Sequence, residues 1–260
     1  MPNLTLYIAQ VNQIWEDKEA NKKYLGDLFQ NTDFQENGLL ILPEMFNTGF
    51  STNPERLAEN WENSSSVNWL TEISNKFQIG IITSLIIQEG SAYYNRLVFV
   101  DKGNLLGYYN KNYLFSLAKE NLKFTSGNEK HVFLFNEWRI LPLICYDLRF
   151  PELSRIQTTN QEPHYDLLVY VANWPQKRIS HWNKLLEARA IENLSYSVGV
   201  NRVGIDGNDI VYNGDSKVVN PLGEVVAQFQ NGREGIFEVN IDSENVNQIR
   251  NQLGFLNDIK

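Results

Sequence analysis

The chain has 260 residues, 42% of them hydrophobic, and a formal net charge of −8 at pH 7. This length is ample for one large hydrophobic core, and we expect a single domain over residues 1–260. The acidic balance and the lack of a Lys/Arg cluster at helical spacing argue against a nucleic-acid partner. The single cysteine excludes an internal disulfide and a cysteine-rich zinc site.

The sequence gives no sign of export or membrane insertion. Its first residues lack the charged and apolar regions of a secretory signal. No apolar run approaches the roughly 20 residues that a membrane-spanning helix needs. We therefore expect a cytoplasmic protein with no membrane association.

Hydrophobic periodicity predicts alternating strands and helices in the first half of the chain. In chain order these are strand 4–10, helix 15–30, strand 38–42, helix 65–77, strands 79–87, 93–100 and 105–109, a loop with a helical turn at 114–125, and strands 132–135 and 139–144. Gly103 supplies the positive φ of a turn between two of these strands.

The second half continues the alternation. Pro151 is suited to the first turn of a helix, and Ser243 is suited to cap the last one. Between them we expect strand 166–171, helix 181–193, and strands 196–202, 216–220, 224–229 and 235–240. Asn220-Pro-Leu-Gly223 fits a type I turn. Strand–helix alternation mixed with hairpins predicts a layered α/β protein with a mixed sheet, and no linker or repeat divides it.

Three chemically useful side chains follow predicted strands. Glu44 follows strand 38–42, Lys111 follows strand 105–109, and Cys145 follows strand 139–144. If these strands run parallel in one sheet, the three side chains emerge at the same edge. A carboxylate can then serve as base for the thiol, and an ammonium can stabilise an oxyanion.

Each of these residues also has a plainer interpretation. Cys145 could be a small buried hydrophobe, Glu44 a cap of the following segment and Lys111 a solvated charge. The chain's three histidines form no recognisable motif with Cys145, and no spacing suggests a metal site. Patterns for nucleotide binding are also absent, so we expect no cofactor.

Several sequence blocks resemble those of the nitrilase superfamily of carbon–nitrogen hydrolases. They occur in the order and spacing of that family and cover nearly the whole chain. The blocks are Leu42-Pro-Glu44-Met-Phe46, Tyr109-Asn-Lys111-Asn-Tyr-Leu-Phe115, Cys145-Tyr-Asp-Leu-Arg-Phe-Pro-Glu152, Asn173-Trp-Pro175, His181-Trp182, Ala188-Arg-Ala-Ile-Glu-Asn193, Gly214-Asp-Ser216 and Pro221-Leu-Gly223. Together these blocks are highly specific, although each alone is weak.

The resemblance implies an α–β–β–α sandwich, with sandwiches paired into a homodimer. It also implies a catalytic set of Glu44, Lys111 and Cys145, together with a second glutamate that positions substrate, for which Glu120 is the best match. One departure is Tyr113, where many relatives have histidine two residues after the lysine. Because Lys111 is retained, we expect the chemistry to survive with a different hydrogen bond beside it.

Within the superfamily the chain is most similar to bacterial ω-amidases. The residues that carry this likeness are Met45-Phe-Asn-Thr-Gly-Phe50, Asn173-Trp-Pro-Gln-Lys-Arg178 and Asn201-Arg-Val-Gly204-Ile-Asp-Gly-Asn208. The resemblance implies hydrolysis of the terminal amide of 2-oxo dicarboxylic acid monoamides, chiefly 2-oxoglutaramate, to a dicarboxylate and ammonia. Nitrile hydrolysis, carbamoyl-amine hydrolysis and deaminated-glutathione amidase activity would use the same residues. A catalytically silent scaffold is a further alternative, which the retention of the whole set disfavours.

The expected mechanism passes through a thioester on Cys145. Lys111 and the backbone N–H of Tyr146 are predicted to stabilise the oxyanion. Arg178 is our candidate partner for a substrate carboxylate, because arginine suits bidentate binding, although a surface arginine is an equal alternative. Phe46 and Trp174 are candidate pocket walls, with core packing as the alternative. Arg149 and Glu152 are expected to pair with each other.

Overall fold

The computed structural model describes residues 3–156, 158–159, 162–229 and 232–259. Two large sheets dominate these described ranges. The first sheet contains β1 (Leu4–Gln10), β2 (Leu39–Ile41), β3 (Glu59–Asn60), β4 (Gly80–Glu89), β5 (Ala92–Asp101), β6 (Asn104–Asn110) and β17 (Gly235–Ile241). The second contains β7 (Phe133–Phe135), β8 (Trp138–Ile144), β11 (Leu167–Ala172), β12 (Tyr196–Asn201), β15 (Ser216–Val219) and β16 (Val225–Phe229).

Both sheets are mixed, as the hairpins within the alternation predicted. The strand order is β17-β1-β2-β4-β5-β6 in the first sheet, with β3 beside β4, and β16-β15-β12-β11-β8-β7 in the second. Two short hairpins complete the strands, β9 (Thr158–Thr159) with β10 (Glu162–Pro163), and β13 (Val203–Ile205) with β14 (Val211–Asn213). The pattern had not predicted these hairpins.

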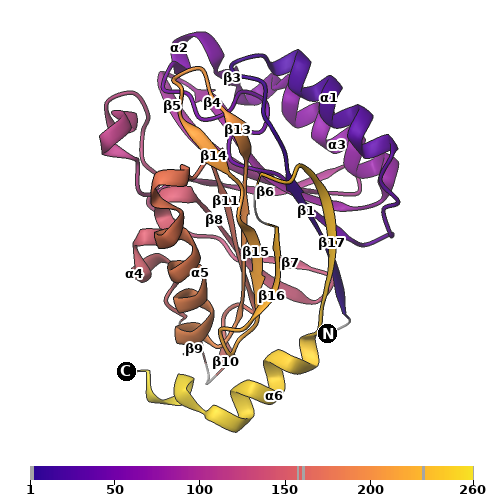
Figure 1. Ribbon diagram of the computed structural model, residues 1–260, viewed down its shortest axis with the longest axis vertical. Coiled ribbons are helices and arrows are strands. Elements are labelled where there is room, and N and C mark those ends of the chain that lie inside the picture. Colours follow the sequence, from indigo (N-terminus) through magenta and orange to yellow (C-terminus); the bar gives the residue numbers. More distant parts are fainter. Residues whose placement is uncertain (1–2, 157, 160–161, 230–231, 260) are drawn as a thin grey trace.

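The layers follow an α–β–β–α order, which confirms the predicted architecture (Figure 1). Helices α1 and α3 cover the first sheet, and α4 and α5 lie beside the second (Figure 1). The helices are α1 (Lys18–Gln30), α2 (Pro54–Leu57), α3 (Ser65–Phe77), α4 (Pro151–Ser154), α5 (Ile179–Asn193) and α6 (Ser243–Leu253). Every helix in the described ranges is too short or too polar to cross a lipid bilayer.

Side chains that alternate along the strands allow the first sheet to contribute to two hydrophobic clusters. In β1, Leu6 and Ile8 belong to the cluster that joins the two sheets. The intervening Tyr7 and Ala9 belong to a different cluster, where they pack with Phe29 of α1. Successive side chains of a strand point to opposite faces, so one face meets the second sheet and the other meets the helices. The second sheet is buried throughout its centre, and β11 runs parallel to both neighbours with every residue buried.

Helix α5 begins two residues before the predicted start, at Ile179. Two other helix starts differ from the predicted ones because aspartates cap them. The first helix begins at Lys18 instead of residue 15, since the side chain of Asp17 accepts a hydrogen bond from the N–H of Ala20 at 3.0 Å. The cap of α6 is Asp242, which accepts from the N–H of Glu244 at 2.8 Å, so the predicted cap Ser243 is the first helical residue.

The loop predicted at 114–125 contains short helical turns, as expected. Residues Ser116–Ala118 and Glu120–Leu122 each form a single 3₁₀ turn. The predicted turn before Glu224 also forms, with the N–H of Gly223 donating to the carbonyl of Asn220 at 2.9 Å.

Candidate active site

The three predicted catalytic side chains do meet, but they come from two sheets and not from one. Glu44 and Lys111 follow β2 and β6 of the first sheet, whereas Cys145 follows β8 of the second. The premise of a single parallel sheet was therefore wrong. In the first sheet β2 is parallel to β4, and the antiparallel steps to β5 and β6 restore that direction. The carboxyl ends of β2 and β6 therefore lie at one edge, where the second sheet brings Cys145.

A buried ion cluster forms the centre of the site. The Nζ atom of Lys111 lies 2.9 Å from Oε1 of Glu44, and 3.1 and 3.0 Å from Oε1 and Oε2 of Glu120. All three side chains are at most 1% exposed. Burial alone would lower the pKa of Lys111, but the charges of Glu120 and Glu44 outweigh burial and raise it. Lys111 is therefore a fixed cation at neutral pH.

Two asparagines that the sequence reasoning missed complete the cluster. The Nδ2 atom of Asn95 lies 2.8 Å from Oε1 of Glu44 and 3.1 Å from Oε1 of Glu120. The backbone N–H of Asn173 donates to Oε2 of Glu44 at 3.0 Å, and its Nδ2 donates to the Glu44 carbonyl at 2.5 Å. Asn173 lies in a block that carried the family resemblance, whereas nothing local distinguishes Asn95.

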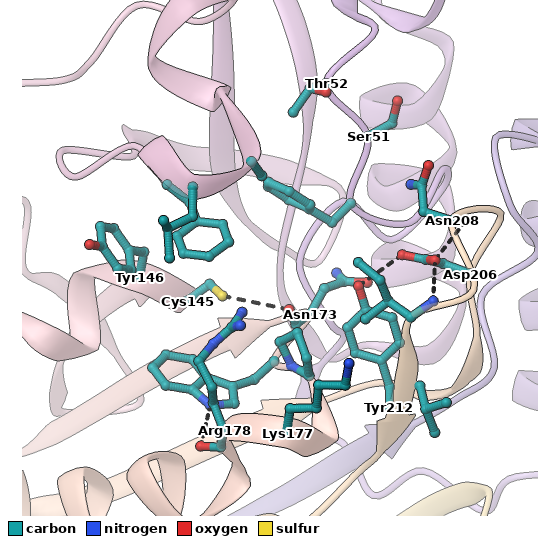
Figure 2. A pocket seen from close by; sticks show the side chains of 18 of the residues that line it. Ser51, Thr52, Cys145, Tyr146, Asn173, Lys177, Arg178, Asp206, Asn208 and Tyr212 are labelled. Carbon is teal, nitrogen blue, oxygen red and sulfur yellow. Dashed lines mark hydrogen bonds between the residues drawn. The ribbon is translucent and has the colours of Figure 1, made fainter.

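Cys145 occupies a sharp backbone turn at the end of β8. Its φ of 45° lies in the left-handed region, and a 3₁₀ turn covering Cys145–Arg149 follows at once. Its Sγ atom lies 3.9 Å from the carbonyl oxygen of Asn173 (Figure 2). Burial raises the pKa of the thiol, nearby Glu44 raises it further, and Lys111 offsets only part of this. The thiol is therefore protonated at rest and needs a base when it reacts.

The turn that carries Cys145 is tied to the lysine loop by Asp147. One carboxylate oxygen of Asp147 accepts from the N–H of Ile144 at 3.0 Å and from the hydroxyl of Tyr109 at 2.9 Å. The other accepts from the N–H of Tyr113 at 2.9 Å. Burial raises the pKa of Asp147 to about 7 despite these bonds. Tyr146 is the second residue of the turn, and the first N–H groups of a helix lack acceptors within it.

The departure from the family pattern at Tyr113 has a clear structural role. Its ring stacks on Phe150, with centroids 3.5 Å apart, and its hydroxyl donates to Glu152 at 2.5 Å. Glu152 is thus engaged by Tyr113 and not by Arg149, so the predicted Arg149–Glu152 pair was wrong.

A pocket of about 820 Å³ opens over the thiol (Figure 2). Lys111, Cys145 and Asn173 line it, together with the predicted residues Trp174 and Arg178. Phe46 does not line it, which corrects the prediction that it walls the pocket. Phe46 is fully buried and stacks on Trp69 with ring centroids 5.8 Å apart. Phe50 lines the pocket in its place, with Nζ of Lys111 lying 5.3 Å from its ring centroid.

Two guanidinium groups lie on the pocket wall. Arg178 ends a 3₁₀ turn covering Gln176–Arg178, and its guanidinium lies 5.1 Å from the ring centroid of Phe115. Arg149, which the sequence reasoning assigned to a different role, lies 4.8 Å from the Trp174 ring centroid and contacts Nδ1 of His181 at 3.2 Å. Burial and the neighbouring charge of Arg178 lower the pKa of Arg149. Both arginines line the same pocket as Cys145.

A loop between β13 and β14 makes another wall. One carboxylate oxygen of Asp206 accepts from the N–H groups of Asn208 and Ile210 at 2.8 and 3.0 Å. Its other oxygen accepts from the hydroxyl of Tyr212 at 2.9 Å (Figure 2). These bonds hold the loop in one shape. Among the described residues, no group of three or more His, Cys, Asp or Glu side chains could hold a metal ion.

A buried Glu–Lys–Glu cluster faces a cysteine at the junction of two sheets in an α–β–β–α sandwich, and these are groups that cysteine-dependent hydrolysis of a carbon–nitrogen bond could use. The family model described as carbon-nitrogen hydrolase matches residues 6–251, and the chain belongs to this family. This finding confirms the resemblance carried by the sequence blocks.

The chain is similar to two curated relatives and to one solved structure. The omega-amidase YafV of Escherichia coli K12 is 41% identical over 87% of this chain and 85% of its own length. The 2-oxoglutaramate amidase of Bacillus subtilis 168 is 33% identical over 90% of each chain. The structure of XC1258 from Xanthomonas campestris, a CN-hydrolase superfamily protein with an arsenic adduct in its active site, matches with a TM-score of 0.94. It is 34% identical and covers 100% of this chain and 98% of its own.

Proposed function

We propose that this protein is an ω-amidase, which hydrolyses the terminal amide of 2-oxo dicarboxylic acid monoamides such as 2-oxoglutaramate. The observation that carries the proposal is the Glu44–Lys111–Glu120 cluster, buried beside the Cys145 thiol in a pocket with two arginines. The names of the relatives that align over most of the chain support the same substrate class. The products are the dicarboxylate and ammonia.

In the proposed first half-reaction, Glu44 takes the thiol proton as Sγ of Cys145 attacks the amide carbon. As the proton moves to Glu44, its negative charge is replaced by one on the amide oxygen, so the net charge of the buried site does not change. The amide oxygen becomes an oxyanion, which Nζ of Lys111 and the N–H of Tyr146 stabilise. Glu44 then returns the proton to the nitrogen, the C–N bond breaks, and ammonia leaves a thioester on Cys145.

In the second half-reaction, Glu44 takes a proton from water, whose oxygen attacks the thioester carbon. The C–S bond breaks, the acid is released, and the thiol regains its proton. Throughout both steps Glu120 keeps Lys111 charged and fixed, since both of its oxygens lie within 3.1 Å of Nζ. One further bond holds Glu120 itself, because its Oε2 accepts from the N–H of Phe115 at 2.6 Å.

The substrate carboxylate is proposed to bind the two guanidinium groups. Arg149 and Arg178 both line the pocket, and each rests on an aromatic ring that fixes it, Trp174 for the first and Phe115 for the second. Arginine binds carboxylates through paired N–H donors, which fixes orientation as well as charge. The thiol then attacks the amide at the far end of the substrate.

The substrate class is tested by a panel of compounds. We expect ammonia release from 2-oxoglutaramate with a kcat/KM about 10²-fold above that for pentanamide, which has the same chain length but lacks both the carboxylate and the oxo group. A coupled assay for ammonia measures both. The ω-amidase assignment would be rejected if folded protein released no ammonia from 2-oxoglutaramate but hydrolysed a nitrile or a carbamoyl amine. The protein would then have a different substrate class of the same family.

The arginine pair predicts a selective defect in binding. Replacing Arg178 or Arg149 by alanine is expected to raise KM for 2-oxoglutaramate about 10- to 100-fold, because each loses a charge-assisted hydrogen bond. The KM for pentanamide should stay within threefold of wild type. Arg155→Ala is a matched control, since Arg155 is exposed and outside the pocket. An unchanged KM for 2-oxoglutaramate in both pocket variants would reject carboxylate binding at this wall.

A further inference from the structure

Asn95, in the middle of β5, touches each member of the buried ion cluster. The side chain is fully buried. Its Nδ2 atom lies 2.8 Å from Oε1 of Glu44 and 3.1 Å from Oε1 of Glu120. Its backbone carbonyl accepts from the N–H of Lys111 at 3.0 Å. One residue of the first sheet therefore contacts the proposed base, the proposed oxyanion cation and the second carboxylate.

The orientation of this amide is fixed by chemistry. Both side-chain partners are carboxylate oxygens, which only accept hydrogen bonds, so the N–H₂ end of Asn95 must face them. A rotation by 180° would turn Oδ1 toward two negative charges. In the observed orientation Oδ1 is buried and has no hydrogen-bond partner in the described part of the chain. The protein thus leaves one acceptor unsatisfied in order to give Glu44 and Glu120 one donor each.

The donor from Asn95 fills one of the acceptor positions of Glu44. Oε1 accepts from Asn95 at 2.8 Å and from Lys111 at 2.9 Å, which occupies both of its lone-pair directions. Oε2 accepts from the backbone N–H of Asn173 at 3.0 Å and keeps one direction open. We propose that Asn95 is a positioning residue that reserves Oε2 of Glu44 for the proton of Cys145. This inference deepens the proposed function and rests on Glu44 acting as the base.

Glu44 is surrounded by other titratable groups, so the loss of Asn95 should affect the pH dependence of the whole set. In the described residues Glu44 is faced by Lys111 after β6, Glu120 from the adjoining 3₁₀ turn and Cys145 after β8, with Asn95 and Asn173 as neutral donors. Without the Asn95 donor, the carboxylate form of this set of groups is less stable than it is in the wild type. The acid limb of the kcat/KM profile, which reports the set as a whole, should then move to higher pH.

The test compares Asn95→Ala and Asn95→Asp with wild type. In Asn95→Ala we expect kcat for 2-oxoglutaramate to fall about 10²-fold with KM within threefold, because the base is no longer held in register. The acid limb of the kcat/KM profile should move to higher pH by at least about one unit. Asn95→Asp has nearly the same shape but adds a negative charge, so its acid limb should move to still higher pH. Asn193→Ala is a control, because Asn193 is an equally buried amide whose Nδ2 bonds the Arg189 carbonyl.

A second readout does not depend on the substrate. Because Cys145 is the only cysteine, the rate of alkylation by iodoacetamide reports on this thiol alone. Its dependence on pH should shift in the same direction in both Asn95 variants and stay at the wild-type position in Asn193→Ala. Wild-type pH profiles in both Asn95 variants would overturn the positioning role. A wild-type protein that is inactive on 2-oxoglutaramate, but whose alkylation profile shifts on loss of Asn95, would instead reject only the substrate assignment.

Discussion

Cys145→Ala is expected to lower kcat for ammonia release from 2-oxoglutaramate by at least about 10⁴-fold, since it removes the nucleophile of the proposed mechanism. The sulfur is near the carbonyl of Asn173 and part of the buried cluster, but it supplies no bond that the fold requires. The melting temperature should therefore stay within a few degrees of wild type. Turnover and thermal unfolding of both proteins, measured on the same preparation, separate loss of chemistry from loss of structure.

Cys145→Ser is the matched variant for this prediction. It keeps the shape of the side chain and a donor to Glu44, but its hydroxyl is a far weaker nucleophile without a stronger base. We expect kcat of the serine variant to be close to that of the alanine variant. Mass spectrometry of wild type quenched during turnover should show the acyl group on the chain, and neither variant should carry it as a thioester. Alanine-variant activity above about 1% of wild type would contradict covalent catalysis by Cys145.

Lys111→Met is expected to damage both catalysis and stability. Loss of the oxyanion partner should cost about 10²–10³-fold in kcat. Removing the cation also leaves Glu44 and Glu120 buried without compensation, and breaking a buried ion pair costs about 3–5 kcal/mol of unfolding free energy. For a chain of this size the melting temperature should fall by about 10 °C. Thermal unfolding and steady-state kinetics measure the two effects.

A double variant separates these effects. Lys111→Met with Glu120→Gln restores the formal charge of the buried cluster, so we expect it to regain at least half of the lost melting temperature while remaining inactive. Lys123→Met is the control, because Lys123 pairs with Glu55 at 2.7 Å on the surface, where such pairs contribute little. Recovery of activity in the double variant would reject the oxyanion role of Lys111. An unchanged melting temperature in the single variant would reject its stabilising role.

The strands and the candidate nucleophile could be predicted because their signals are local. Period-two alternation and short apolar runs identify a buried strand without knowledge of its partners. The distribution of strands between the sheets could not be predicted in this way. β2 and β8 are similar apolar runs, yet β2 pairs with β1 and β4 whereas β8 pairs with β7 and β11. Pairing depends on contacts distant in sequence, and therefore the single-sheet premise was wrong although its three residues meet.

The missed site residues have the same explanation. Asn95 appears in the sequence as one polar residue within a strand, and only the β4-β5-β6 register sets it beside Lys111. Arg149 and Glu152 have a spacing that suits a pair on a regular helix. The 3₁₀ turn ends at Arg149 and α4 begins at Pro151, so this regular spacing is interrupted.

The choice between two phenylalanines was also beyond local reasoning. Phe46 and Phe50 flank the same turn, and only Phe46 was predicted to wall the pocket. Met45, just before the first, has a φ of 48° in the left-handed region. The tight turn there sends Phe46 into the core beneath α3, while Phe50 reaches the pocket.

In the proposed mechanism the reacting groups are divided between two sheets, which makes the packing between the sheets a condition of catalysis. Glu44, Lys111 and Glu120 all precede the second sheet in the chain, and the nucleophile arrives only with β8. Neither half of the sandwich holds a complete set. A compact state with both sheets formed but loosely docked would therefore be inert, because sliding of one layer by a single ångström would part the thiol from its base. If the proposed mechanism holds, the turnover rate reports how closely the two sheets pack against each other.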